Sequence, residues 1–220
     1  MKKTIIIPAY NEEDGIKEVI TRVKKVCSDG DEIIVVDDGS RDRTKEIAKR
    51  MGVRILVHKT NKGKAIALKT GYRAAKNDVV VTIDADCTYP PEEIPNLVKN
   101  MDGYDLVVGS RFKNGIPEGL SLLRGLTNIM GAFYASFILF KRVTDVTTGM
   151  RAFRKNVVEA CKIRARGLDF EAEFTSRAIT MGFRYNEIPI NADERIGRSK
   201  LKFFRDTFKF AIAILRGRLR

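Results

Sequence analysis

Two carboxylates one residue apart follow a strongly apolar run. Asp84 and Asp86 flank Ala85, directly after the valines, threonine and isoleucine of 79–83. Oxygens at this spacing can bind one Mg²⁺ or Mn²⁺, and such an ion can bridge a diphosphate and stabilise a leaving group. The alternative is that both aspartates are solvated turn residues that cap the next helix. The position after a predicted strand favours the metal site.

A second acidic turn, Asp37-Asp38-Gly39-Ser40, follows the apolar run at 32–36. A carboxylate here can accept a hydrogen bond from the N–H of a nucleobase while the turn shapes the pocket. The alternative is an ordinary turn in which Ser40 or Asp42 caps the next helix. Both roles can hold together because they use different residues.

Cationic side chains in the second half suit contacts with phosphate, because one guanidinium can bind two phosphate oxygens. They are Arg111, Arg124, Arg151, Arg195, Arg198 and Lys200. Any one of them alone indicates only solvated surface. The segment 195–200 is more specific, since a glycine and a serine among three cations predict a flexible phosphate clamp.

The overall charge agrees with a phosphate-bearing partner. Lys and Arg number 41 against 28 Asp and Glu, a formal net charge of +13. This favours nucleotides, nucleic acid or an anionic membrane, with plain solubility as the alternative. The three scattered cysteines argue against a disulfide framework and suit a reducing cytosol. The single histidine, His58, excludes a multi-histidine zinc site within the chain and indicates a structural role.

The elements that must position these side chains alternate between strand and helix in the first half. Strands are predicted at 4–7, 32–36, 54–57, 79–83 and 106–108, and helices at 13–26, 43–51, 64–75 and 92–101. Such alternation predicts an α/β fold with a mostly parallel central sheet and helices on both faces. Ligands bind beyond the carboxyl ends of such strands. The polar clusters at 8–13, 37–40, 84–86 and 109–111 should therefore converge.

The second half is less regular. We expect a long apolar helix or helix pair at 120–140, one strand at 144–153, a helix at 168–181, a strand at 184–188 and a helix at 200–215. The apolar stretch at 125–140 is short for a membrane span, which predicts a buried or interfacial helix. The last helix has an apolar stripe among cations, so it could lie on a membrane or cover the core. The N-terminus shows no signal-peptide core.

Several common nucleotide and hydrolase motifs are absent from the sequence. The first strand does not lead into Gly-x-Gly-x-x-Gly, and there is neither a P-loop nor a Gly-x-Ser-x-Gly elbow. This disfavours a dinucleotide-binding Rossmann domain, a P-loop NTPase and an α/β-hydrolase.

Taken together, these segments resemble family 2 glycosyltransferases, specifically the dolichol-phosphate mannose synthase and polyprenyl-phosphate glycosyltransferase branch. The resemblance spans Ile5 to about Leu201. Its parts stand in the family order: PAYNEE at 8–13, DDGS at 37–40, NKGKAIA at 61–67, DAD at 84–86, PPEEIP at 90–95, GSR at 109–111, TTGMRAF at 147–153 and RIGRSKL at 195–201.

The resemblance implies a GT-A nucleotide-diphospho-sugar transferase fold over 1–199, followed by a basic amphipathic helix over 200–220. It also implies an inverting, metal-dependent transfer of a hexose from a GDP- or UDP-sugar to a polyprenyl (dolichyl) phosphate. The ionised phosphate nucleophile would need no strong base, and alignment and charge stabilisation would supply the rate. We expect a cytoplasmic enzyme, peripheral at the cytoplasmic face of the membrane, with no nucleic-acid partner.

The resemblance also assigns roles to individual residues. Donor-binding residues would be Pro8, Tyr10, Glu12, Asp37, Ala85 and Lys200. Catalytic residues would be Asp84, Asp86, Arg111, Arg124 and Arg195, and the acceptor phosphate would meet Arg111, Arg124, Arg195 and Ser199. Asp84 and Asp86 would hold Mg²⁺ or Mn²⁺. Where many relatives have a glutamine ligand, this chain has Thr88, which could bind through its hydroxyl or a water.

Three alternatives stay open. A hydroxyl acceptor on a glycan or small molecule would need a base, for which Asp145 or Asp169 are the candidates. A nucleotidyltransferase would share the sheet and the metal carboxylates, but it usually opens with a glycine-rich basic loop. A non-catalytic nucleic-acid-binding module would exploit the positive charge. Neither the base and sugar of the donor nor the oligomeric state follows from these residues.

Overall fold

The computed structural model describes residues 1–117, 122–193, 195–197 and 203–219, and the side chains of 122–124 and 203–206 lie outside the described part. Its centre is a seven-stranded sheet in the order β3-β2-β1-β4-β6-β5-β7. The strands are β1 (Lys3–Ala9), β2 (Glu32–Asp37), β3 (Arg54–Val57), β4 (Val79–Thr82), β5 (Leu106–Ser110), β6 (Arg151–Arg154) and β7 (Tyr185–Pro189). Among these described strands β6 runs antiparallel to both its neighbours, and the other pairs are parallel.

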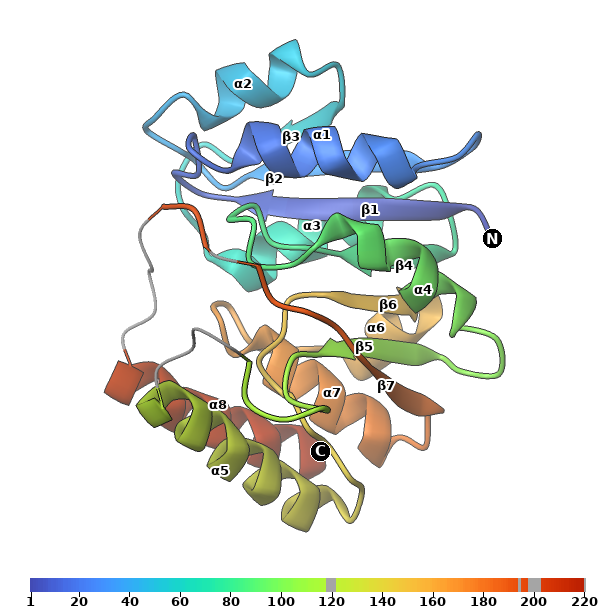
Figure 1. The fold of residues 1–220 in the computed structure, drawn as a ribbon, viewed down its shortest axis with the longest axis vertical. Helices are drawn as coiled ribbons and strands as arrows, with labels where there is room; N and C mark the ends of the chain where they lie inside the picture. The colour runs from blue at the N-terminus through green and yellow to red at the C-terminus, as the bar shows by residue number, and fades with distance from the viewer. Residues whose placement is uncertain (118–121, 194, 198–202, 220) are drawn as a thin grey trace.

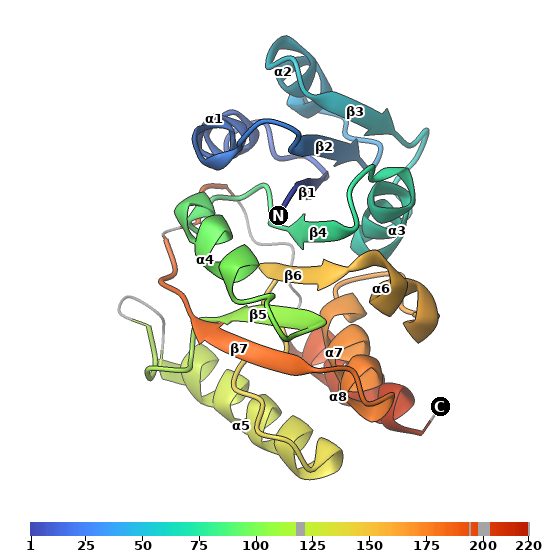
Figure 2. The same cartoon turned by 90° about the vertical axis from the view of Figure 1, so that its right-hand side faces the viewer.

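Helices cover both faces of the sheet, as Figure 2 shows. One face carries α1 (Ile16–Val26), α2 (Thr44–Arg50) and α4 (Ile94–Lys99), the last preceded by the 3₁₀ turn η1 (Pro91–Glu93). The other carries α3 (Lys64–Ala74), α6 (Lys155–Cys161) and α7 (Phe170–Thr180). Beyond this second layer lie α5 (Leu122–Leu139) and α8 (Phe203–Arg218). The α/β class with a mostly parallel sheet is therefore confirmed.

The apolar runs form central strands because their side chains alternate between two cores. In β1, Ile5 and Ile7 pack into the core under α1, while Ile6 packs into the core under α3. Ile34 and Val36 in β2 likewise join the α3 side, and Val35 joins the other. Water is excluded from both faces, which explains the continuous rather than alternating hydrophobic pattern.

The predicted single strand at 144–153 is wrong, because only Arg151–Arg154 forms β6. The backbone N–H groups of Thr144 and Asp145 donate to the Glu187 carboxylate rather than to the carbonyl groups of a neighbouring strand. The segment before β6 is thus a loop held by a buried acid. The short helix α6, directly after β6, was not predicted.

The last helix packs closely on the helix before it. Ala213 and Ile214 of α8 are buried in the core under α3. The Ser176 hydroxyl of α7 donates to the Ile214 carbonyl at 2.6 Å. A Cβ on Gly217 would lie 2.6 Å from the Ser176 Cβ, so the glycine permits this approach. Within the described part of the chain, no helix combines the length and the apolar character needed to cross a bilayer.

Candidate functional site

The carboxyl ends of β1, β2 and β4 meet at one edge of the sheet, and the polar segments that follow them are joined there. The Asn11 N–H donates to the Ser40 hydroxyl at 3.0 Å, and the Glu12 N–H donates to the Thr44 hydroxyl at 2.8 Å. The loop after β1 is thereby fixed to the acidic turn after β2. The predicted convergence is confirmed for the clusters at 8–13 and 37–40.

The first carboxylate of the acid pair, Asp84, is held by a cation from α3. The Lys64 ammonium lies 2.6 Å from Asp84 Oδ1 and 2.8 Å from Glu171 Oε1 of α7. Burial disfavours the charged ammonium, but the two carboxylates outweigh burial and raise the pKa of Lys64 well above its ordinary value. One ammonium shared by two carboxylates leaves this group with net negative charge. Two further guanidinium groups act on the same carboxylates, Arg111 on Asp84 and Arg151 on Glu171.

Room for the Asp84 carboxylate depends on a glycine in the loop before β6. A Cβ on Gly149 would lie 2.6 and 2.7 Å from the two Asp84 oxygens. The Gly149 N–H also donates to the buried Tyr89 hydroxyl at 2.9 Å, which fixes the loop in place. Any larger residue at 149 would push the carboxylate out of its present position.

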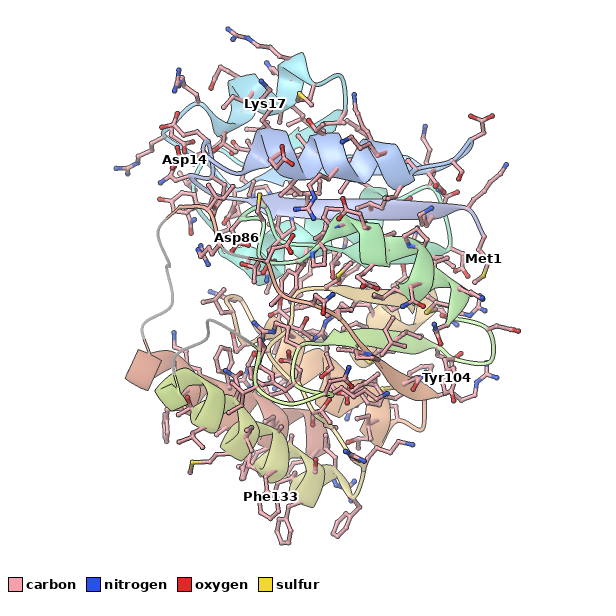
Figure 3. All side chains as sticks on the ribbon, viewed as in Figure 1. Met1, Asp14, Lys17, Asp86, Tyr104 and Phe133 are labelled. Carbon is pink, nitrogen blue, oxygen red and sulfur yellow. The ribbon has the colours of Figure 1, made fainter. Side chains whose placement is uncertain are left out.

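The second carboxylate of the pair, Asp86, is held by the segment at 195–197. Arg195 Nη1 lies 2.8 Å from Asp86 Oδ2, and its Nη2 lies 3.8 Å from Glu12. The Ile196 N–H donates to the Asp86 carbonyl at 2.9 Å, so the segment crosses directly over the acidic loop. Figure 3 labels Asp86 at this edge of the sheet. The predicted cation of the clamp thus reaches the predicted metal carboxylate.

Arg111, at the end of β5, forms a bidentate ion pair. Its Nε and Nη2 donate to Asp145 at 2.8 and 3.0 Å, and Nη2 also donates to the Thr147 hydroxyl at 2.9 Å. Its guanidinium carbon lies 5.6 Å from the centre of the Tyr89 ring. Burial raises the pKa of Asp145, but Arg111 outweighs burial and holds that pKa below its usual range.

The acidic turn after β2 divides its two carboxylates between different partners. Asp38 accepts hydrogen bonds from the N–H groups of Lys62 and Gly63, at 3.0 and 2.7 Å, and lies 2.6 Å from His58 Nδ1. It therefore organises the loop before α3, and His58 has a structural contact. Asp37 is buried, and its Oδ1 accepts a long hydrogen bond of 3.4 Å from the Ser40 N–H.

Some predicted site residues are placed by backbone contacts. Pro8 is buried within β1, opposite Val36. Ala85 is buried, and its carbonyl would lie 2.6 Å from a Cβ on Gly15 at the start of α1. The Thr88 N–H donates to Asp86 at 3.0 Å.

The remaining predicted residues differ in how far the structure describes them. Tyr10 is half-buried in the loop after β1. The side chain of Arg124, in the first turn of α5, lies outside the described residues, as do Ser199 and Lys200. Arg151, expected as a cation for phosphate, is fully buried and donates to the Thr148 and Glu171 carbonyls, so it is structural.

The structure also brings in residues to which no role was given. Lys64 and Gly149 lie inside the motifs NKGKAIA and TTGMRAF, so their positions could have been suspected. Glu171 and Tyr89 are harder to find. Their partners are distant in sequence, and only the packing of α7 against the sheet brings Glu171 to Lys64.

The two carboxylates fit a hard divalent cation, although the described residues contain no cluster of three or more His, Cys, Asp or Glu side chains arranged for a metal. Both offer oxygen, the donor that Mg²⁺ and Mn²⁺ prefer. Each already binds a cationic nitrogen at 2.6–2.8 Å. Because residue 149 is a glycine, the Asp84 carboxylate can lie directly against the backbone of this loop. An ion here would need further ligands from water or a bound diphosphate.

Comparison with known proteins gives a consistent result. A sequence profile described as "Glycosyl transferase family 2" matches residues 4–161. The chain is 36% identical over 201 residues to the "Dolichyl-phosphate hexose transferase" of Haloferax volcanii, covering 91% of this chain and 86% of that protein. It is 33% identical to the "Dolichol-phosphate mannosyltransferase" of Pyrococcus furiosus, covering 92% of this chain and 60% of that protein.

Solved structures resemble the fold at lower sequence identity. A glucosyl-3-phosphoglycerate synthase from Mycobacterium tuberculosis, in complex with Mg²⁺ and uridine diphosphate, superimposes with a TM-score of 0.80 at 20% identity. The match covers 98% of this chain and 79% of that one. At this identity the likeness concerns the fold alone.

Proposed function

The chain belongs to glycosyl transferase family 2, and on that premise we propose that it transfers a hexose from a GDP- or UDP-sugar to a polyprenyl phosphate, with inversion at the anomeric carbon. It is a glycosyltransferase with the GT-A fold that the sequence predicts. Nucleotidyl transfer and nucleic-acid binding are therefore set aside.

One observation supports the donor site above all others. The acid pair after β4 lies beneath two cations from distant parts of the chain, Lys64 on Asp84 and Arg195 on Asp86. Such alternation of carboxylates and cations suits a nucleotide diphosphate with its counter-ion. The nucleoside would lie over Pro8, Tyr10, Glu12, Asp37 and Ala85, whose loops share this edge.

We assign Asp84 and Asp86 as the ligands of Mg²⁺ or Mn²⁺, with Thr88 contributing its hydroxyl or a water. When bound, the ion would neutralise negative charge on the departing diphosphate. Solved structures with this fold contain Mn²⁺ or Mg²⁺ together with uridine diphosphate. Lys64 and Arg195 would then be able to turn from the carboxylates toward the donor phosphates, which Lys200 would also bind.

The state of Asp145 favours an acceptor that is already ionised. Its carboxylate is sealed from solvent and bound bidentately by Arg111, so it is not placed to take a proton from a hydroxyl. Asp169 at the start of α7 lies 3.7 Å from Arg216, on the side of α8. A phosphate oxygen needs no base, and Arg111, Arg124, Arg195 and Ser199 would align it and stabilise its charge.

Two relatives are named for transfer to dolichyl or dolichol phosphate. An acceptor of this kind lies in a bilayer, so we propose that the chain acts as a peripheral protein at the cytoplasmic face of the membrane. The helix α8 would contribute to this attachment.

Product analysis with a labelled donor tests the proposal. GDP-mannose and UDP-glucose, each with Mg²⁺ or Mn²⁺, are offered undecaprenyl phosphate, dolichyl phosphate or a saccharide. Label should enter the organic phase, chelator should prevent this, and Asp86→Ala should abolish it. Label found only in the saccharide would instead support the hydroxyl acceptor and refute the lipid phosphate.

A thermal-shift series separates donor binding from turnover. Metal-dependent stabilisation by at least one GDP or UDP species is expected. Asp86→Ala should remove the shift, measured against the melting temperature of the same variant without ligand, because loss of the buried Asp86–Arg195 pair itself lowers stability. The same shift with chelator as with metal would contradict the assigned metal ligands.

A further inference from the structure

A buried carboxylate on the last strand of the sheet has no part in the chemistry proposed above. Glu187 belongs to β7, which lies beside β5 at the end of the sheet opposite β3 (Figure 1). In the parallel pairing of the two strands Glu187 stands across from Val108, shortly before Arg111. Only 6% of its surface is exposed. Because burying an ionised group is costly, its hydrogen-bond partners indicate what its position serves.

The Glu187 carboxylate accepts hydrogen bonds from neutral donors of the loop before β6 and of its own strand. Both oxygens accept the Thr144 N–H, at 3.0 and 2.9 Å, and Oε2 accepts the Thr144 hydroxyl at 2.6 Å. Oε1 also accepts the Asp145 N–H at 3.3 Å and the Tyr185 hydroxyl at 2.5 Å. Burial and the neighbouring Glu187 raise the pKa of Tyr185 well above its ordinary value, so this hydroxyl stays a donor.

A chain of hydroxyl groups leads from Glu187 to the backbone on either side of Arg111. The single hydrogen of the Thr144 hydroxyl goes to Glu187, so Thr144 accepts from the Ser110 hydroxyl at 2.6 Å. The Ser110 oxygen in turn accepts the Phe112 N–H at 3.3 Å. Since Ser110 and Phe112 are the two neighbours of Arg111, this chain fixes the turn at which β5 ends.

A second route leads from Glu187 to the Arg111 side chain. The backbone N–H of Asp145 is held by Glu187, and the Asp145 carboxylate binds the Arg111 guanidinium bidentately. The same carboxylate accepts the Arg111 N–H at 3.3 Å. One buried acid therefore determines both where the Arg111 backbone lies and where its guanidinium is held.

We infer that Glu187 is a positioning residue for Arg111 and acts on the acceptor phosphate through that side chain. The inference rests on the proposed function, in which Arg111 binds the phosphate of the acceptor. A guanidinium binds two phosphate oxygens only in a suitable orientation, so a small displacement weakens the contact and the alignment. The residues assigned to the donor lie on other loops, so donor binding should not depend on Glu187.

Glu187→Gln tests the inference with a short-chain, water-soluble polyprenyl phosphate as acceptor. Glutamine keeps the length of the side chain but replaces one acceptor oxygen with an NH₂ group, which cannot accept from the loop. The kcat/KM for the acceptor should fall by about tenfold or more, while the KM of the donor changes by less than about twofold.

Glu32→Gln is the matched control. Glu32 likewise accepts a threonine hydroxyl and a backbone N–H, those of Thr4 and Lys76, but it stands at the start of β2, at the opposite edge of the sheet from the acid pair. It should keep the wild-type kcat/KM for the acceptor. An equal fall in both variants would overturn the inference, because loss of any buried acid would then explain the effect.

A double-variant cycle separates positioning from a general loss of stability. If Glu187 acts through Arg111, adding Glu187→Gln to Arg111→Lys should lower the acceptor kcat/KM by less than about twofold further. A further fall of about tenfold would overturn the inference, since the effect of Glu187 would then not pass through Arg111.

Thr144 gives a second test should Glu187→Gln not fold. Thr144 is half-buried, and Thr144→Val removes the hydroxyl that links Glu187 to Ser110 while keeping the shape of the side chain. Its kcat/KM for the acceptor should fall by about fivefold, and Thr144→Ser, which keeps the hydroxyl, should retain the wild-type value. Equal values for the valine and serine variants would overturn the hydroxyl chain.

Nuclear magnetic resonance of the Arg111 Nε–H measures the positioning without acceptor or turnover. The signal is assigned by its absence from Arg111→Lys. Its exchange with water should be about tenfold faster in Glu187→Gln than in the wild type and in Glu32→Gln, and unchanged exchange would overturn the inference. Faster exchange in Glu187→Gln, combined with a wild type that labels only the saccharide, would refute the proposed function and leave the positioning of Arg111 standing.

Discussion

The ion pair between Arg111 and Asp145 makes a quantitative prediction for Asp145→Asn. The substitution keeps the shape of the side chain and removes its charge. Removing one partner of a buried ion pair costs about 3–5 kcal/mol. Because Arg111 retains 18% side-chain exposure and asparagine retains one acceptor oxygen, we expect the lower end, about 3 kcal/mol. In a chain of this size, that loss lowers the melting temperature by about 6–12 °C.

The chain offers a matched control at its surface. Asp105 accepts Nε and Nη2 of Arg184 at 3.2 and 3.1 Å, the same bidentate chemistry, but the Arg184 side chain is 62% exposed. Asp105→Asn should cost no more than about 1 kcal/mol, because solvent screens such pairs. Urea unfolding of both variants at neutral pH measures the difference. Equal losses in the free energy of unfolding would refute the idea that burial makes the Arg111–Asp145 pair more stabilising than the surface pair.

Three further predictions concern pH, packing and charge in the site. Since Arg111 holds the pKa of Asp145 below its ordinary value, this pair stabilises the fold above about pH 4 and loses its effect as pH falls through the lower folded-state pKa. Urea unfolding across acid pH should therefore show the gap between wild type and Asp145→Asn closing, and a constant gap would contradict this. Gly149→Ala should weaken Mn²⁺-dependent donor binding at least tenfold in calorimetry, whereas Gly131→Ala, with no atom near its Cβ, should not. Glu171→Gln should weaken Mn²⁺ binding about tenfold in a paramagnetic-resonance titration, because Lys64 then neutralises its remaining carboxylate fully; unchanged affinity with a lowered melting temperature would make Glu171 merely structural.

The first half of the fold was predictable because its central strands, β1, β2 and β4, are largely buried on both faces. The runs at 32–36 and 79–83 appear within one residue of their predicted ends, since a central strand can bury so many β-branched side chains. The loop at 143–150 was not predictable. Its letters resemble a strand, but the buried Glu187 carboxylate, from a later strand, captures the N–H groups of Thr144 and Asp145.

The site was predictable to the extent that its residues follow strands. Asp84 and Asp86 were found because a parallel sheet collects such positions at one edge. The cation that holds Asp84 was missed, since Lys64 begins a helix and is locked by Glu171 from another helix far along the chain. Local patterns indicate which groups face the edge, while only tertiary packing determines which of them are paired.

The antiparallel strand β6 has a consequence for how donor affinity is acquired during folding. Its insertion joins Val79 of β4 to Arg154 and carries Gly149 to the Asp84 carboxylate. A nascent chain that ends before residue 143 contains both acids but not the loop that seats the first one. Pairings between such distant segments form slowly. Donor binding would therefore report that β6 has entered the sheet between β4 and β5.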